Sequence, residues 1–272
     1  NAQASGSPGD VTEVQVASGT YIPTRRRDAT DARSRTFYID GDNVEVYAGY
    51  PSGGGTRDPD ANPVVLSGDV DGDDDPYAPQ SDSDGDGSTP TQTDHISGSN
   101  AYNVLFLDAA SSDITNSTII DGVTVTAGFS NGASSPANRG GGLFCRAGSG
   151  QTCSPSLDGT TFYGNYADVA GGAVYNGAVG AASPTFANSV FRGNASGGDG
   201  GAIANDPQNG AGTSNPSLTN ATVVANAALG NGGAIWNHAA TSGETASPSI
   251  TNVSLTGRSE ERRVGKECIV KC

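Results

Sequence analysis

Gly171-Gly172-Ala173-Val174 returns twice further along the chain, as Gly200-Gly201-Ala202-Ile203 and as Gly232-Gly233-Ala234-Ile235. An earlier copy reads Gly141-Gly142-Leu143-Phe144. Each copy is followed by a motif with a central proline, and these prolines are Pro155, Pro184, Pro216 and Pro248. A third motif closes three copies: Phe162-Tyr-Gly-Asn165, Phe191-Arg-Gly-Asn194 and Val223-Val-Ala-Asn226. The prolines are 29, 32 and 32 residues apart, and a period in this range is typical of a solenoid of stacked repeats.

The residue types decide the kind of solenoid. Short runs rich in Val, Ile, Phe and Thr alternate with Gly, Asn, Ser and Pro, and no apolar stretch has a helical period. Three strands of roughly four to six residues, with their turns, fill a coil of about thirty residues. Stacking then places each strand beside its counterpart one coil on, about 4.8 Å away. Because parallel crossovers are right-handed, the sequence predicts an all-β, right-handed parallel β-helix over residues 115–256.

Glycine and asparagine recur at fixed places in these coils. The paired glycines permit tight corners with positive φ. The recurring asparagines Asn176, Asn205 and Asn237 suit a left-handed corner position, and stacked Asn amides can hydrogen-bond from coil to coil. Tyr175 and Trp236 hold equivalent places, which predicts one exposed aromatic column. Such a column either stacks on sugars or is ordinary surface.

The first part of the chain, residues 1–114, is less regular. Runs with strand character cover residues 11–18, 36–40 and 44–50, and the first two are separated by Arg25-Arg26-Arg27, which we interpret as a solvated loop tip. We expect irregular coils of the same solenoid here, followed by regular repeats over residues 115–257. Residues 69–94 hold many Asp and no Lys or Arg, which predicts a long acidic surface loop.

Composition and charge narrow the classes of function. The 272 residues include 40 Gly and no Met, only 34% are hydrophobic, and the net charge is −15. A thin repeat-built core explains the low hydrophobic content better than a single thick core does. The acidic surface argues against nucleic acid and anionic membranes as partners, and no apolar run is long enough for a membrane helix.

The last residues break the pattern. The stretch Arg258-Ser-Glu-Glu-Arg-Arg-Val-Gly-Lys-Glu-Cys268 is charged and shares nothing with the repeats. It resembles the translation of a common short-read sequencing adapter, so we expect residues 258–272 to be a non-biological tail without a stacking partner. The tail holds five of the 14 basic and three of the 29 acidic residues, which leaves nine and 26, a net charge of −17. Without the tail, we expect the chain to be an internal fragment of a longer bacterial protein.

The Gly-Gly-Ala-Ile and Phe-x-x-Asn motifs resemble the repeats of chlamydial polymorphic outer-membrane proteins. The resemblance covers residues 140–256, and Val223 departs from it where other copies have Phe. It implies a β-helical passenger region, exported by an autotransporter route, located at the outer membrane or outside the cell, and used in adhesion. Residues 16–23, 47–50 and 66–69 resemble the region that precedes such repeats in large secreted bacterial proteins.

Two groups of aspartates have the spacing of calcium ligands. Asp82, Asp84 and Asp86 stand at positions one, three and five of a calcium-loop pattern, with Gly87 at position six. Position twelve is Thr93, which cannot supply the bidentate carboxylate. Asp69, Asp71 and Asp73 form a similar acidic set. The sequence therefore predicts calcium as the one candidate cofactor, and a merely solvated acidic loop is the alternative.

Cys145 and Cys153 are candidates for a disulfide, since both precede the tail and an exported protein favours oxidation. The Asn-x-Ser/Thr triplets at Asn116, Asn194, Asn220 and Asn252 are interpreted as turn and ladder asparagines, not glycan acceptors.

The sequence favours a non-enzymatic, adhesin-like binding module whose partner is a surface molecule or glycan. The alternative is a polysaccharide lyase or glycoside hydrolase, because enzymes of both kinds use this fold. Either would need acids or an Arg, such as Arg192, gathered across neighbouring coils. His95 and His238 are isolated in the sequence, and the chain before the tail has no Lys.

Overall fold

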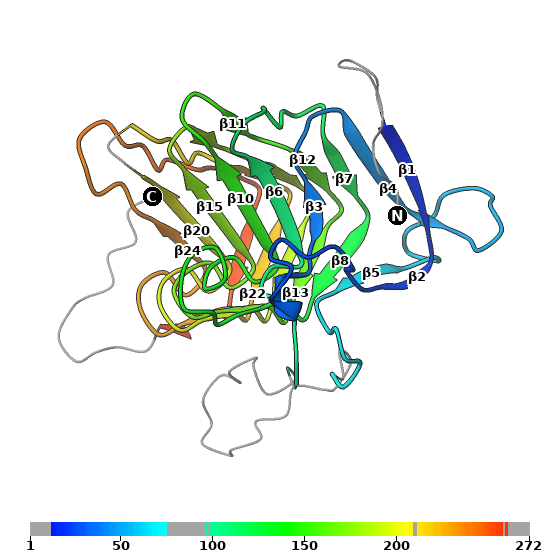
Figure 1. Cartoon of the computed structure of the whole chain (residues 1–272). Coiled ribbons are helices and arrows are strands. Elements are labelled where there is room, and N and C mark those ends of the chain that lie inside the picture. Colours follow the sequence, from blue (N-terminus) through cyan, green and yellow to red (C-terminus); the bar gives the residue numbers. More distant parts are fainter. Residues whose placement is uncertain (1–11, 75–95, 97, 209–210, 258, 261–272) are drawn as a thin grey trace.

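The structure is a computed structural model that describes residues 12–74, 96, 98–208 and 211–257, together with the backbone of residues 259–260. The chain winds through stacked coils of short strands, and the coils from β7 onward repeat the same circuit (Figure 1). Each strand pairs in parallel with its counterpart in the neighbouring coil. The predicted parallel β-helix is therefore confirmed.

Four long sheets run along the stack. Sheet 1 contains β1 (Thr12–Ala17), β4 (Val44–Tyr50), β7 (Ile119–Asp121), β12 (Ser156–Asp158), β17 (Thr185–Ala187), β21 (Ser217–Thr219) and β25 (Ser249–Thr251). Sheet 2 contains β2 (Gly19–Tyr21), β5 (Val64–Ser67), β8 (Val123–Thr126), β13 (Thr161–Tyr163), β18 (Val190–Arg192), β22 (Thr222–Val224) and β26 (Ser254–Thr256).

The other two sheets complete the circuit. Sheet 3 contains β3 (Phe37–Ile39), β6 (Leu105–Ala109), β10 (Leu143–Ala147), β15 (Val174–Ala178), β20 (Ile203–Pro207) and β24 (Ile235–Asn237). Sheet 4 contains β9 (Phe129–Ser130), β14 (Tyr166–Ala167), β19 (Ala195–Ser196), β23 (Ala227–Ala228) and β27 (Ser259–Glu260). A small pair, β11 (Thr152–Cys153) and β16 (Ala181–Ala182), and the short 3-10 helix η1 (Ala32–Ser34) lie in the connections.

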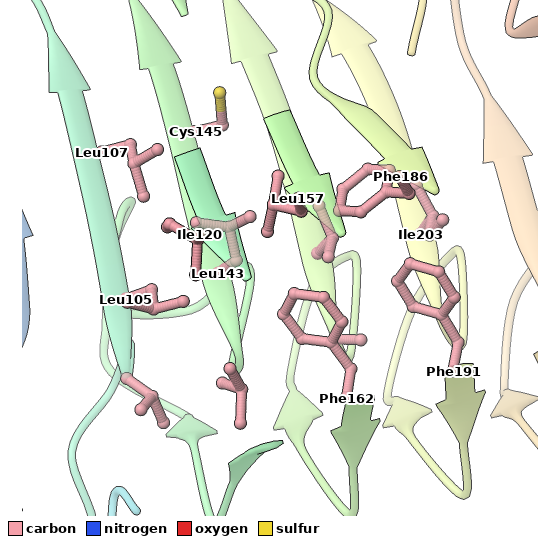
Figure 2. Packing of buried hydrophobic residues seen from close by; sticks show 14 of the residues in the cluster. Leu105, Leu107, Ile120, Leu143, Cys145, Leu157, Phe162, Phe186, Phe191 and Ile203 are labelled. Carbon is pink, nitrogen blue, oxygen red and sulfur yellow. The ribbon is translucent and has the colours of Figure 1, made fainter. Parts of the chain in front are cut away.

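One core runs through the middle of the stack. The central residues of the three-residue strands in sheets 1 and 2 point inward, as Leu157, Phe186, Phe162 and Phe191 show (Figure 2). These four side chains are fully buried. Burying one such side chain contributes about 1.5–3 kcal/mol, and neighbouring coils repeat the contact. A low overall hydrophobic content is enough because each short strand supplies only one large core residue.

The pairing register corrects the alignment of the first repeat. Leu143 pairs with Val174, and Val174 pairs with Ile203. The first copy is therefore Gly140-Gly141-Gly142-Leu143, one residue earlier than the sequence motif placed it. Three consecutive glycines carry no side-chain information, so the motif alone could not set the register.

The two glycines of each repeat have different roles. The first is a corner with positive φ, as predicted, and φ is 67° at Gly171 and 65° at Gly200. The second lies where backbones meet, because a Cβ at Gly172 would overlap the carbonyl oxygens of Ala195 and Gly201. The repeat thus needs glycine twice, once for conformation and once for space.

Asparagine ladders lie inside the solenoid. The Asn194 amide nitrogen donates to Asn226 at 2.9 Å, and Asn165 donates to Asn194 at 3.0 Å. All three side chains are fully buried. Inside the core, each amide satisfies the next, which offsets the cost of burying a polar group.

The second ladder corrects an expectation. Asn176 donates to Asn205 at 2.8 Å, and Asn205 donates to Asn237 at 2.7 Å, so these amides bond from coil to coil as predicted. They lie within strands of sheet 3 and not at left-handed corners. The left-handed corners are taken by other asparagines, namely Asn188, Asn220 and Asn252, with φ of 49°, 54° and 52°. Of the Asn-x-Ser/Thr asparagines, Asn194, Asn220 and Asn252 are therefore ladder or turn residues, as interpreted.

The end of the chain differs from the expected tail. β27 pairs in parallel with β23, with Ser259 opposite Ala227 and Glu260 opposite Ala228. The prediction that residues 258–272 have no stacking partner is wrong for these two residues, because extended backbone at a sheet edge pairs whatever its side chains. Residues 258 and 261–272 lie outside the described part of the chain.

Candidate functional site

The outer face of sheet 3 carries a column of aromatic rings. In register, its successive coils present Tyr38, Phe106, Phe144, Tyr175, Ala204 and Trp236. The first four rings follow one another with centroids 5.7, 5.2 and 5.0 Å apart. This spacing follows the rise of the coils, since each ring stands one strand further along the sheet.

The column is covered, which corrects the predicted exposed column. Only 1% of Tyr175 is exposed, and Trp236 is half-buried. Guanidinium groups lie over the rings instead, with Arg25 4.1 Å from the centroid of Tyr38 and Arg27 4.3 Å from that of Phe106. Guanidinium groups bind aromatic faces through the ring quadrupole and by stacking. The face that meets solvent is therefore rich in arginine.

A pocket of about 240 Å³ opens at one end of this face. Its lining residues, which we call the arginine pocket, are Arg25, Arg26, Arg27, Tyr38, Phe106, Asp108 and Arg146. Arg146 donates to both carboxylate oxygens of Asp108 at 2.7 Å, and the Tyr38 hydroxyl donates to the same group at 2.7 Å. The interpretation of residues 25–27 as a solvated loop tip is wrong for Arg27, which is half-buried over the Phe106 ring. Arg25 is exposed, although its guanidinium lies over Tyr38.

Arg27 is the least satisfied member of this pocket. Its Nε is buried and has no hydrogen-bond partner among the described residues, and its Nη2 donates to Asn103 at a long 3.4 Å. Burial, followed by the positive charge of Arg146, lowers the pKa of Arg27. The pocket thus holds a guanidinium that lacks a paired carboxylate within the described residues.

A second polar group lies further along the same face. His238 Nδ1 is 2.9 Å from a carboxylate oxygen of Asp206, and its ring stacks on Trp236 with centroids 4.7 Å apart. The Tyr175 hydroxyl donates to the other oxygen of Asp206 at 2.6 Å. Burial, followed by the charge of Asp206, raises the pKa of Tyr175. His238 is isolated in sequence but not in space, because Asp206 lies one coil away.

The candidate calcium ligands are partly described. One ligand atom from each of Asp69, Asp71 and Asp73 lies within 4.8 Å of the others. Asp69 also accepts backbone hydrogen bonds from Gly72 at 2.7 Å and Asp74 at 3.2 Å, so part of its carboxylate already holds the loop. Desolvation, and then the charge of Asp71, raises the pKa of Asp73. Three carboxylates at this separation fit a hard cation.

The other predicted calcium ligands, Asp82, Asp84 and Asp86, lie outside the described residues, as does His95. Arg192 is exposed at the end of β18, with its guanidinium 5.7 Å from the centroid of Tyr163. It belongs to sheet 2, whereas His238 and Asp206 lie on sheet 3. The structure therefore does not place Arg192 on the same face as the histidine.

Cys145 and Cys153 are joined by a disulfide with Cα atoms 6.0 Å apart, and both are fully buried. Cys145 stands opposite Asn176 in the pairing of β10 and β15. The disulfide thus occupies the place that an asparagine amide holds in the later coils.

The segment from the corner before β13 to β15 resembles a known repeat. Residues 159–177 match the Chlamydia polymorphic membrane protein (Chlamydia_PMP) repeat. No curated protein and no solved structure matches the chain. Within the matched Chlamydia_PMP repeat, Phe162, Asn165 and Asn176 are the buried core and ladder residues, and Gly171 forms the corner. The repeat motif therefore consists of the residues that pack and hydrogen-bond one coil to the next.

Sequence reasoning missed the residues that build the outer face, above all Asp108, Arg146 and Asp206. Their signal is the column alignment: Asp108, Arg146, Gly177 and Asp206 follow one another in register, two residues after the aromatic column. No helix among the described residues is long and apolar enough to cross a membrane.

Proposed function

We propose that this chain is a non-enzymatic, adhesin-like binding module that is secreted or displayed on a bacterial cell surface. The matched Chlamydia polymorphic membrane protein repeat supports a location at the outer membrane. A buried disulfide supports export, because disulfides persist in oxidising compartments. The partner is a surface molecule or glycan, not nucleic acid.

One observation carries this proposal: the repeated residues and the variable residues face opposite ways. Glycines, asparagines and core apolar residues recur from coil to coil and point inward or form corners. On the outer face of sheet 3, arginine, aspartate, glycine and histidine differ from coil to coil. The six strands of that face give a surface roughly 24 Å long at about 4.8 Å per strand. A long rigid surface of this kind suits the binding of a large partner.

The experiment is a binding survey with the full chain. The protein is labelled and applied to a panel of neutral and acidic glycans and to intact cells, and binding is measured against concentration. We expect saturable binding to at least one glycan or cell surface, without chemical change of the ligand. If no member of the panel shows saturable binding, the proposal is wrong.

A second function is favoured by the pair of His238 and Asp206. A carboxylate bonded to one ring nitrogen orients an imidazole so that the other nitrogen can take a proton, as a polysaccharide lyase or glycoside hydrolase would require. The test is incubation with the same polysaccharides, followed by assay for unsaturated or reducing ends. Release of such ends that is lost in His238→Ala would make the chain an enzyme. Intact polymers would favour the binding module.

A further inference from the structure

We infer that the arginine pocket binds the carboxylate of an acidic glycan, with Arg27 as its principal partner. This inference rests on the proposed binding function and names the ligand chemistry. The pocket combines four guanidinium groups with a single lining carboxylate, that of Asp108. Both oxygens of Asp108 are already engaged by Arg146 and Tyr38. The carboxylate inside the pocket thus neutralises Arg146 and leaves Arg27 without a counter-ion among the described residues.

The geometry of Arg27 points to an anion from outside. The Arg27 guanidinium lies over the Phe106 ring, 4.3 Å from its centroid. Its Nε is buried, so an external ligand would meet Arg27 through its terminal nitrogens. Arg26, the preceding residue, is exposed, and its Nη1 donates to the carbonyl of Ala29 at 3.2 Å. A planar carboxylate can accept two parallel hydrogen bonds from the terminal nitrogens of one guanidinium.

The other arginines extend the cationic surface along sheet 3. Arg25 lies over Tyr38 of β3, and Arg146, which is carried by β10, lies 5.7 Å from the Phe106 ring that Arg27 also covers. Arg139 lies 5.4 Å from the ring of Tyr175 on β15. The cations therefore span the strands from β3 to β15, roughly 14 Å at ~4.8 Å per strand, which suits a ligand of several acidic units.

A glycan fits this face better than nucleic acid does. Double-stranded DNA carries one charge per roughly 1.7 Å, and this face also carries acids, since Asp40 lies beside Arg25 and Asp206 beside His238. A densely charged polyanion would meet these acids, in a chain whose net charge is −15. A glycan built of uronic acids carries one carboxylate per sugar. Its charges are therefore sparser than those of nucleic acid and can lie away from these acids. Five of the nine arginines that precede the tail lie over this one face, namely Arg25, Arg26, Arg27, Arg139 and Arg146.

The experiment is calorimetric titration of the full chain with trigalacturonate, and with its methyl ester as the uncharged control. We expect saturable binding of the acid and none of the ester. Arg27→Gln should weaken binding about tenfold, since a lost charge-assisted hydrogen bond of roughly 1.4 kcal/mol corresponds to that factor. Arg192→Gln removes the same charge from sheet 2 and should leave affinity unchanged within about twofold. Arg27→Lys keeps the charge and reports a geometric requirement if it also weakens binding.

The opposite results overturn the inference. One is binding of the methyl ester as tight as that of the acid. Another is unchanged affinity of Arg27→Gln in protein with a native circular dichroism spectrum. A third is an equal loss of affinity in Arg27→Gln and Arg192→Gln, which would mean that only the overall charge matters. A glutamate-rich peptide of equal charge that binds as tightly would replace the glycan with an acidic protein partner. If only neutral glycans bind, the pocket assignment is wrong while the binding module stands. If nothing binds in the wider survey, the proposed function itself fails.

Discussion

Replacing the buried Asn194 with alanine should destabilise the solenoid far more than the loss of one exposed asparagine side chain would. The side chain makes four hydrogen bonds of 2.9–3.1 Å to the neighbouring coils and a fifth, of 3.3 Å, to Arg192 of its own coil. Its nitrogen donates to Phe162 in the preceding coil and to Asn226 in the following one, and its oxygen accepts two donors of Asn165. At about 1 kcal/mol net for each bond between coils, the loss is about 4 kcal/mol. That is a large fraction of the 5–15 kcal/mol that stabilises a typical domain.

The assay is urea unfolding followed by far-ultraviolet circular dichroism, from which midpoint and slope give the free energy of unfolding. The control is Asn188→Gly, which removes an exposed asparagine and its solvent-exposed 2.8 Å hydrogen bond to Asp158, at a φ of 49° that glycine adopts freely. It should cost below about 1 kcal/mol. If Asn194→Ala cost less than about 1 kcal/mol, or no more than the control, the ladder would not be what holds these coils together.

Three further predictions concern other parts of the chain. Removing the disulfide with Cys145→Ser and Cys153→Ser should lower the free energy of unfolding by roughly 2–3 kcal/mol. In a second variant, with only Cys268 and Cys272 changed to serine, the folded protein should not react with thiol reagents. Labelling of Cys145 or Cys153 would contradict this. Calcium at a hundredfold over its dissociation constant should stabilise the fold by about 2.7 kcal/mol, while Asp71→Asn with Asp73→Asn abolishes the effect; the same shift with magnesium would argue for a merely acidic loop. Because the pKa of Asp73 is raised, protons compete for the site, so calcium affinity should fall as the pH is lowered. Gly172→Ala should cost about 1–3 kcal/mol by overlap with two carbonyl oxygens, whereas Gly41→Ala, where no atom lies within 4 Å of the added Cβ, should change stability by less than about 1 kcal/mol in either direction.

The sequence predicted the architecture because the residues that build it recur. Pro184 and Pro216, or Asn194 and Asn226, stand 32 residues apart, and the same spacing reappears in the strand register. The inward direction of Asn176 was not predictable from its own coil. A buried amide is stable only with Asn205 bonded to it, and that partner is 29 residues away.

The candidate site was harder to predict for the same reason. Arg27 lies on Phe106, and His238 meets Asp206, and in both cases the partner belongs to another coil. A single pass along the chain shows these residues as isolated polar positions. The exposure of Tyr175 was misjudged because Arg139 and Asp206 cover and bind it from neighbouring coils. The ladder residues repeat, whereas the residues of the candidate site differ from coil to coil, so the repeat motifs do not reveal that site.

Cross-linking between coils tests most directly the claim that residues about thirty apart stand side by side. Thr185 on β17 pairs with Ser217 on β21, and both are half-buried on the outside of sheet 1. Thr185→Cys with Ser217→Cys, in protein with Cys268 and Cys272 changed to serine, should oxidise readily, because strands ~4.8 Å apart fall within disulfide range. Peptide mapping should locate the bond between residues 185 and 217. Failure to form it, or equally fast bonding of Thr185→Cys with Thr219→Cys, would contradict the stacked register from which the fold and the site are both derived.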